Sequence, residues 1–215
     1  MSKRYQDYVI ADGKLVGDFE NLYKNIDDPW HQSEIDHKFD SRRQLAINYT
    51  LRLNKEFGIK KVVELGCGFG FMTESLRKLG LNSIGTDISE TAIKKARELH
   101  PESKFQVLKF NDFQSLFELD PEVIIMAEIT WYVLDDLSDF IKNLKEYANK
   151  LNKPVYLIHL LATYAPGVQK YGKDKFTNLD EILKFFDLNY LEYGYIKTKT
   201  KFDEDSQGTY FVAKI

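Results

Sequence analysis

Three alternating glycines follow a short apolar run and could form a ligand site. Gly66, Gly68 and Gly70 come directly after residues 62–65, which read Val-Val-Glu-Leu, and helical spacing of apolar residues follows over 71–79. Because glycine accepts positive φ values and has no Cβ, the chain can turn sharply here between a strand and a helix. A loop without side chains also lets an extended ligand lie against the peptide backbone. The stretch therefore predicts a ligand site where a buried strand meets a helix N-terminus.

Two carboxylates, Glu64 and Asp87, would complete such a site. Glu64 lies near the end of the first strand, and Asp87 ends the next predicted strand, where it could accept hydrogen bonds from both hydroxyls of a ribose. The alternative role of Asp87 is to cap the helix that starts at Ser89. Nicotinamide cofactors would use the same acid. In the dinucleotide fingerprint G-x-G-x-x-G, however, the third glycine position would fall on Phe71, whereas the third glycine here is Gly70.

The pattern Glu-x-Gly-x-Gly-x-Gly over 64–70, followed by Asp87, resembles motif I of the class I S-adenosylmethionine-dependent methyltransferases. The resemblance covers about residues 59–215 and implies S-adenosyl-L-methionine as the cofactor. It implies that the turn 111–113 holds the adenine, although a helix cap is the competing interpretation of that turn, and that Arg43 pairs with the methionyl carboxylate. The implied cofactor-binding residues are Glu64, Gly66, Cys67, Gly68, Gly70, Asp87, Ile88, Asn111, Asp112, Phe113, Glu128, Ile129 and Arg43.

The stretch 126–137 ends the fourth predicted strand, which should lie beside the first. Ligands in open α/β sheets bind beyond the carboxyl ends of the strands, so Glu128, Trp131 and Tyr132 should border the reactive methyl group. Aromatic faces stabilise cations, so the two rings could face the sulfonium of the cofactor. The alternative, with equal weight, is that either ring packs beneath the N-terminal residues. With the Asp-Pro-Trp sequence at 28–30, this stretch resembles nodulation-type N-methyltransferases of amino sugars.

Catalytic and substrate-binding candidates follow from these placements. The catalytic candidates are Glu128, Tyr132 and His159. His159 stands in the apolar strand 155–161 and could face the cleft, with a satisfied core histidine as the competing interpretation. The substrate-binding candidates are Trp30, His31, Trp131, Tyr132 and Tyr164, the last within a predicted lid over 163–175 that contains a Pro-Gly hinge.

Short strands that alternate with helices from residue 59 onward predict an α/β fold. We expect a doubly wound, mostly parallel seven-stranded sheet of the Rossmann-like methyltransferase type, with an N-terminal helical cap. The cap should comprise residues 1–58, including one helix or a helix pair that is capped at Ser33 and ends near Gly58, with Asp40-Ser41 as the break between the two helices of the pair. The cofactor-binding domain should comprise residues 59–215. The expected strands are 61–65, 82–86, 104–108, 123–127, 155–161, 190–201 and 209–215.

Composition narrows the function classes. The chain has 215 residues, a formal net charge of −3 and a single cysteine. The charge argues against a nucleic-acid partner, and one cysteine excludes an internal disulfide and a cysteine-built zinc site; we expect no metal. The sequence has no apolar run of membrane-spanning length, so we expect a cytoplasmic protein with no membrane partner. We also expect a monomer or homodimer with a small-molecule substrate.

The predicted activity is S-adenosylmethionine-dependent methyl transfer to an oxygen or nitrogen of a small polar metabolite. Candidate acceptors are a sugar, or a nucleotide-linked, phosphorylated or phosphoramidate precursor of a surface polysaccharide. Two alternatives stay open: a nicotinamide-dependent oxidoreductase, and a non-catalytic protein that binds the cofactor or a partner chain.

Overall fold

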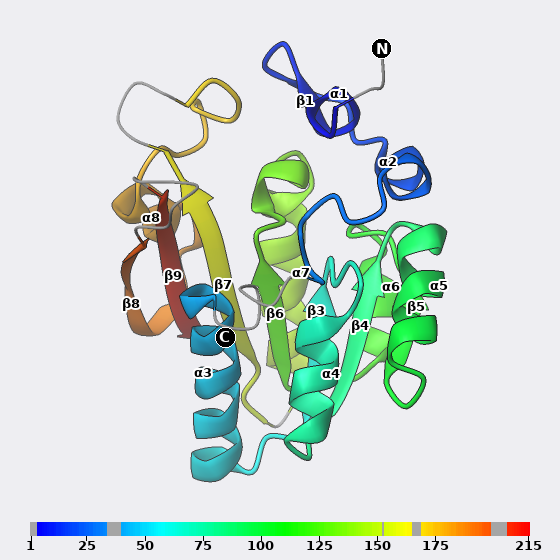
Figure 1. The fold of residues 1–215 in the computed structure, drawn as a ribbon. Helices are drawn as coiled ribbons and strands as arrows, with labels where there is room; N and C mark the ends of the chain where they lie inside the picture. Colours follow the sequence, from blue (N-terminus) through cyan, green and yellow to red (C-terminus); the bar gives the residue numbers. More distant parts are fainter. Residues whose placement is uncertain (1–3, 34–39, 152, 165–168, 199–205) are drawn as a thin grey trace.

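A seven-stranded sheet forms the centre of the molecule (Figure 1). The computed structural model describes residues 4–33, 40–151, 153–164, 169–198 and 206–215. The strand order is β5-β4-β3-β6-β7-β9-β8. β3 to β7 run parallel, and β9 is antiparallel to both of its neighbours. The strands are β3 (Lys61–Leu65), β4 (Asn82–Asp87), β5 (Lys104–Val107), β6 (Val123–Ala127), β7 (Tyr156–Thr163), β8 (Asn189–Thr198) and β9 (Ser206–Lys214). The expected fold class is confirmed.

Helices cover both faces of this sheet, which makes it doubly wound. In Figure 1, α3 (Ser41–Phe57), α4 (Phe71–Lys78) and α5 (Glu90–Leu99) lie in front of the sheet. α6 (Phe113–Glu118) and α7 (Leu137–Lys150) lie behind it, and α8 (Leu179–Phe186) packs into the same rear cluster as α7. This arrangement buries both faces of the parallel strands.

Neighbouring residues of the central strands pack into two separate clusters. Val62 and Ile125 pack into the cluster that includes α3 and α4, whereas Val63 and Ile124 pack into the cluster that includes α7 and α8. Successive side chains of a strand point to opposite faces, so a strand covered on both sides needs apolar residues at every position. The near-continuous apolar runs of the sequence have this cause.

The helix before β3, α3, begins at Ser41, the break that the helix-pair alternative predicts, and ends at Phe57 beside Gly58. Asp40 is the N-cap of α3, and its Oδ1 accepts hydrogen bonds from the N–H groups of Arg42 and Arg43. Ser33 does not cap it, because the Ser33 N–H and hydroxyl both donate to the carboxylate of Asp28. The expected helical positions within 34–39 lie outside the described residues, as does the expected hinge at 166–167.

An N-terminal segment, residues 4–33, lies over the carboxyl ends of the strands and is called the cap below (Figure 1). It contains α1 (Gln6–Val9), a two-stranded hairpin of β1 (Ile10–Ala11) and β2 (Lys14–Leu15), and α2 (Phe19–Asn25). The carboxylate of Glu20 on α2 accepts hydrogen bonds from Ser89 and Thr91 at the start of α5. The cap is thereby fixed directly onto the domain below it.

Within the described ranges, every helix is too short or too polar to cross a membrane.

Candidate functional site

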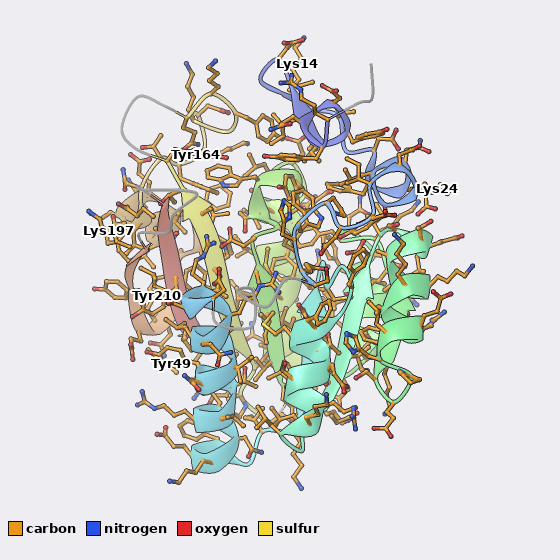
Figure 2. The ribbon with its side chains drawn as sticks, in the orientation of Figure 1. Lys14, Lys24, Tyr49, Tyr164, Lys197 and Tyr210 are labelled. Carbon is orange, nitrogen blue, oxygen red and sulfur yellow. The ribbon has the colours of Figure 1, made fainter. Side chains whose placement is uncertain are left out.

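A cavity of about 670 Å³ lies between the carboxyl ends of the strands and the cap. Five neighbouring strands contribute to its floor, through residues near or just after the carboxyl ends of β5, β4, β3, β6 and β7. Tyr164, labelled in Figure 2, follows the end of β7 and also lines the cavity, whereas Lys14 and Lys24 lie on the outer surface of the cap. Of the predicted site residues, the lining includes Trp30, Arg43, Glu64, Gly66, Asp87, Ile88, Asn111, Glu128, Ile129, Trp131, Tyr132 and Tyr164.

Asp87 points toward the glycine turn. Its buried carboxylate accepts one hydrogen bond from the N–H of Gly68 at 3.0 Å and another from the N–H of Ser89 at 2.9 Å. Burial raises the pKa of Asp87, and these two N–H donors oppose the rise. The carboxylate is thus held beside the turn and exposed to the cavity, which is the geometry a ribose would require.

The glycine turn itself is filled by protein side chains more than the sequence predicts. Gly66, Gly68 and Gly70 have φ of +69°, +54° and +77°, so each adopts a conformation that other residues rarely tolerate. A Cβ on Gly66 would meet Ile129, and one on Gly70 would meet the ring of Phe105 at 2.3 Å. Of these glycines only Gly66 lines the cavity.

Cys67, Gly68 and Gly70, which the sequence predicts to bind the cofactor, do not line the cavity. Cys67 is buried against Phe105 and the α5 side chains, away from the cavity. Gly68 faces the cap, where a Cβ would lie 2.5 Å from the side-chain oxygen of Gln32. The missing side chains make room for packing as much as for a ligand.

The turn after β5 presents different residues from those expected. Asn111 lines the cavity, together with Lys109 and Phe110. Asp112 does not, because its exposed carboxylate accepts the N–H of Ser115 and caps α6. Phe113 packs against the aromatic cluster behind the sheet. The helix-cap interpretation is correct for Asp112, and Phe110 is the aromatic residue that reaches the cavity.

Glu128 follows β6 in a strained conformation. Its φ is +63°, a region that non-glycine residues rarely adopt. Its Oε1 forms an ion pair with Arg42 Nη1 at 2.8 Å, and its Oε2 accepts the N–H of Ala162 at 2.6 Å. Burial raises the pKa of Glu128, and the Arg42 cation opposes that rise. The contacts hold a carboxylate in a fixed orientation at the end of the cavity away from Asp87.

Glu64 and Arg43 place opposite charges near the middle of the floor. Glu64 is buried, accepts a hydrogen bond from the Thr73 hydroxyl, and has a pKa raised by burial to about 7. Burial lowers the pKa of Arg43, and the nearby carboxylate of Glu64 opposes this. A carboxylate and a guanidinium that line the same cavity suit the ammonium and carboxylate groups of an amino acid.

The two histidine candidates are not brought into the site. His159 is fully buried, stacks on Phe211 at 4.6 Å between ring centroids, and shares a 2.7 Å hydrogen bond with the hydroxyl of Thr130. Burial lowers its pKa to about 3, so the ring is neutral at physiological pH. It is a core histidine and not a base for substrate. His31 has φ of +52°, is exposed and does not line the cavity.

The cap supplies a roof that sequence reasoning identified only at Trp30. Phe19, Tyr23 and Gln32 also line the cavity, and the indole N–H of Trp30 donates to the Tyr23 hydroxyl at 3.0 Å. The Trp30 and Tyr132 rings lie 6.0 Å apart, so the roof contacts the segment that follows β6. Phe19 and Tyr23 lie four residues apart on α2, so the helical spacing of this short segment was a signal for them. Gln32 lies in an irregular segment, where no pattern marks it.

The strand order, the glycine turn after β3 and the carboxylate that ends β4 are those of the Rossmann-like methyltransferase fold. A family model described as "Methyltransferase domain" matches residues 63–150. The ubiquinone biosynthesis O-methyltransferase of Aliivibrio fischeri is 30% identical over 142 residues, which are 63% of this chain and 53% of that protein. The chain thus spans about half the length of the curated relative it matches.

Solved structures share the fold. WbdD, described as a bifunctional kinase-methyltransferase, aligns with a TM-score of 0.62 at 18% identity over 86% of this chain and 42% of its own. NodS, an N-methyltransferase from Bradyrhizobium japonicum in complex with S-adenosyl-l-homocysteine, aligns with a TM-score of 0.59 at 18% identity over 87% of this chain and 92% of its own. At these identities the likeness shows the fold of this chain.

Proposed function

We propose that this protein transfers the methyl group of S-adenosylmethionine to an oxygen or nitrogen of a small polar metabolite. The observation that carries the proposal is the order of groups across the cavity floor. Lys109, Phe110 and Asn111 follow β5, Asp87 ends β4, and Glu128 follows β6. Between them, Glu64 lies on β3 and Gly66 directly follows it.

This order matches the order of chemical groups in the cofactor. The base would lie beside Phe110 and Asn111, and the ribose hydroxyls would donate to Asp87. The amino-acid end would lie near Glu64 and Arg43, whose charges are opposite to those of an ammonium and a carboxylate. Bound there, the cofactor would supply an electrophilic methyl group together with its thioether leaving group.

The acceptor would enter beside Glu128 under the aromatic roof. As its oxygen or nitrogen forms a bond to the methyl carbon, the carbon–sulfur bond breaks and the acceptor loses a proton. Tyr132 and Trp131 would shape the acceptor end, and Glu128 would orient the acceptor or accept its proton. Alignment alone can contribute about 7–11 kcal/mol, so the geometry of the floor and roof is the main catalytic resource.

A small acceptor is supported by the enclosure of the cavity, whose roof comes from the same chain. The acidic balance of the chain also opposes a nucleic-acid substrate. We therefore propose a sugar, or a nucleotide-linked, phosphorylated or phosphoramidate precursor of a surface polysaccharide, as the acceptor, and an enzyme that works as a monomer or homodimer.

Calorimetric titration with S-adenosylhomocysteine tests the cofactor, and release of S-adenosylhomocysteine from S-adenosylmethionine tests turnover with each acceptor class. We expect stoichiometric binding, and turnover with at least one sugar or phosphorylated acceptor. A parallel titration with NADH tests the oxidoreductase alternative. No binding of S-adenosylhomocysteine at millimolar concentration would end the proposal, and binding without turnover on any acceptor would favour a non-catalytic protein.

A further inference from the structure

Four successive backbone N–H groups of the glycine turn already have partners inside the protein. Cys67 donates to the carbonyl of Thr86, and Gly70 donates to the carbonyl of Cys67. The other two N–H groups donate to side chains: that of Gly68 to Asp87, and that of Phe69 to the side-chain oxygen of Gln32 at 2.7 Å. The acceptor for Phe69 thus comes from the cap, far away in the sequence.

Burial and hydrogen bonds hold Gln32 in place. Its side chain is buried, with 7% of its surface exposed, and its backbone N–H donates to Asp28 Oδ1 at 2.8 Å. Gly68 provides the space for it, because a Cβ there would lie 2.5 Å from the Gln32 oxygen and 2.9 Å from the Tyr23 hydroxyl. A turn without side chains and an amide from the cap therefore fit each other closely.

Backbone N–H groups at such a turn can donate hydrogen bonds to the oxygens of a phosphate. At a junction of strand, glycine turn and helix, free N–H groups and the positive end of the helix bind the phosphates of a nucleotide. Here a phosphate would have to displace the Gln32 oxygen from Phe69, and it would meet the negative charge of Asp87 at Gly68. The amide of Gln32 satisfies the donor without bringing a charge.

We infer that Gln32 is a specificity-determining residue that keeps phosphorylated nucleosides out of the cofactor position beside the glycine turn. It occupies the N–H group that a 5′-phosphate would take, so that the site accepts nucleosides whose 5′ substituent passes Gly66 toward Glu128. This inference rests on the proposed cofactor position, and it assigns discrimination against phosphate to the cap and not to the glycine turn itself.

Calorimetric dissociation constants for adenosine and ADP test the inference in the wild-type protein and in two variants. Gln32→Ala removes the acceptor, and the ratio of the ADP constant to the adenosine constant should fall about tenfold, since one N–H to a charged oxygen is restored. Gln32→Glu keeps an acceptor and adds a negative charge, so the ratio should stay or rise. Lys14→Ala, on the outer surface of the cap, is the control and should leave the ratio unchanged.

Two results would overturn the inference: an unchanged ratio in Gln32→Ala, or ADP binding that stays undetectable in that variant at millimolar concentration. S-adenosylhomocysteine binding and the urea midpoint of each variant show whether the cavity is intact. Absence of S-adenosylhomocysteine binding by the wild-type protein would instead refute the proposed function, whatever the nucleotide ratio.

Discussion

The hydrogen bonds between Glu20 and the start of α5 should hold the cap closed at neutral pH. Glu20 accepts from the hydroxyls of Ser89 and Thr91, each at 2.6 Å, and from the N–H of Thr91 at 3.2 Å. These donors lower the pKa of Glu20 from an ordinary 4.5 to about 2, although burial alone would raise it. Negative charge at the N-terminus of α5 is also favoured by the helix dipole.

The magnitude follows from that pKa. The difference between 4.5 and about 2 would correspond to about 3 kcal/mol if it were fully effective. The Glu20 side chain is 36% exposed and also pairs with Lys24, so solvent screening reduces the contribution to about 1–2 kcal/mol. Because the pKa is lower in the folded state, this stabilisation is complete above pH 4.5 and disappears as the pH falls toward 2.

Glu20→Gln removes the charge and preserves the shape. Urea unfolding at pH 7 should show a loss of about 1–2 kcal/mol, and the difference from wild type should shrink between pH 4.5 and 2. Hydrogen exchange of the α2 amides of Leu22 and Tyr23 should become faster than in wild type. Glu90→Gln, at an exposed acid in the first turn of α5, is the matched control. A Glu20 variant that equals the Glu90 variant at pH 7, in stability and exchange, would refute the reasoning.

Three further changes test the site and its frame. Asp87→Asn should weaken S-adenosylhomocysteine binding about 10- to 100-fold in calorimetry, because two ribose hydroxyls lose a charged acceptor; unchanged affinity would remove Asp87 from the site. Gly70→Ala should cost about 2–4 kcal/mol in urea unfolding, since strain at φ +77° adds to a clash with Phe105, whereas Gly80→Ala, at φ +86° with open space around it, should cost only about 1–2 kcal/mol; equal losses would contradict the packing argument. His159→Gln should leave the pH–rate profile of methyl transfer between pH 5.5 and 8 unchanged, because the ring is neutral and outside the cavity; disappearance of a titration in that range would restore His159 as a catalytic group.

Local sequence carried much of the information about the fold. The alternation of short apolar runs with helical spacing predicts β3, β4 and β6 within a residue, because strands buried on both faces read as continuous apolar segments. The start of α3 stayed open in the sequence, since Ser33 and Asp40 are both plausible caps. Only the contacts of Asp28 with Ser33 decide between them.

The candidate site was predictable where one strand end supplies it. Asp87, Glu64 and Glu128 follow from strand ends alone, and the structure brings them to one cavity. The shift from Phe113 to Phe110 depends on the shape of a short turn, which composition does not specify. Gln32 was out of reach for a different reason: its partner lies 37 residues away, and a single amide in an irregular segment carries no pattern.

The cavity is lined by two parts of the chain, the strand ends and the cap, which are under different structural constraints. The strand ends below must also satisfy the sheet, so their residues are constrained by burial on both sides. Trp30 and its neighbours in the cap are constrained only by their contacts with each other and by the few contacts that anchor the cap to the domain. Substitutions in the cap alone could thus change the acceptor preference and leave the strand-end residues proposed to bind the methyl donor unchanged.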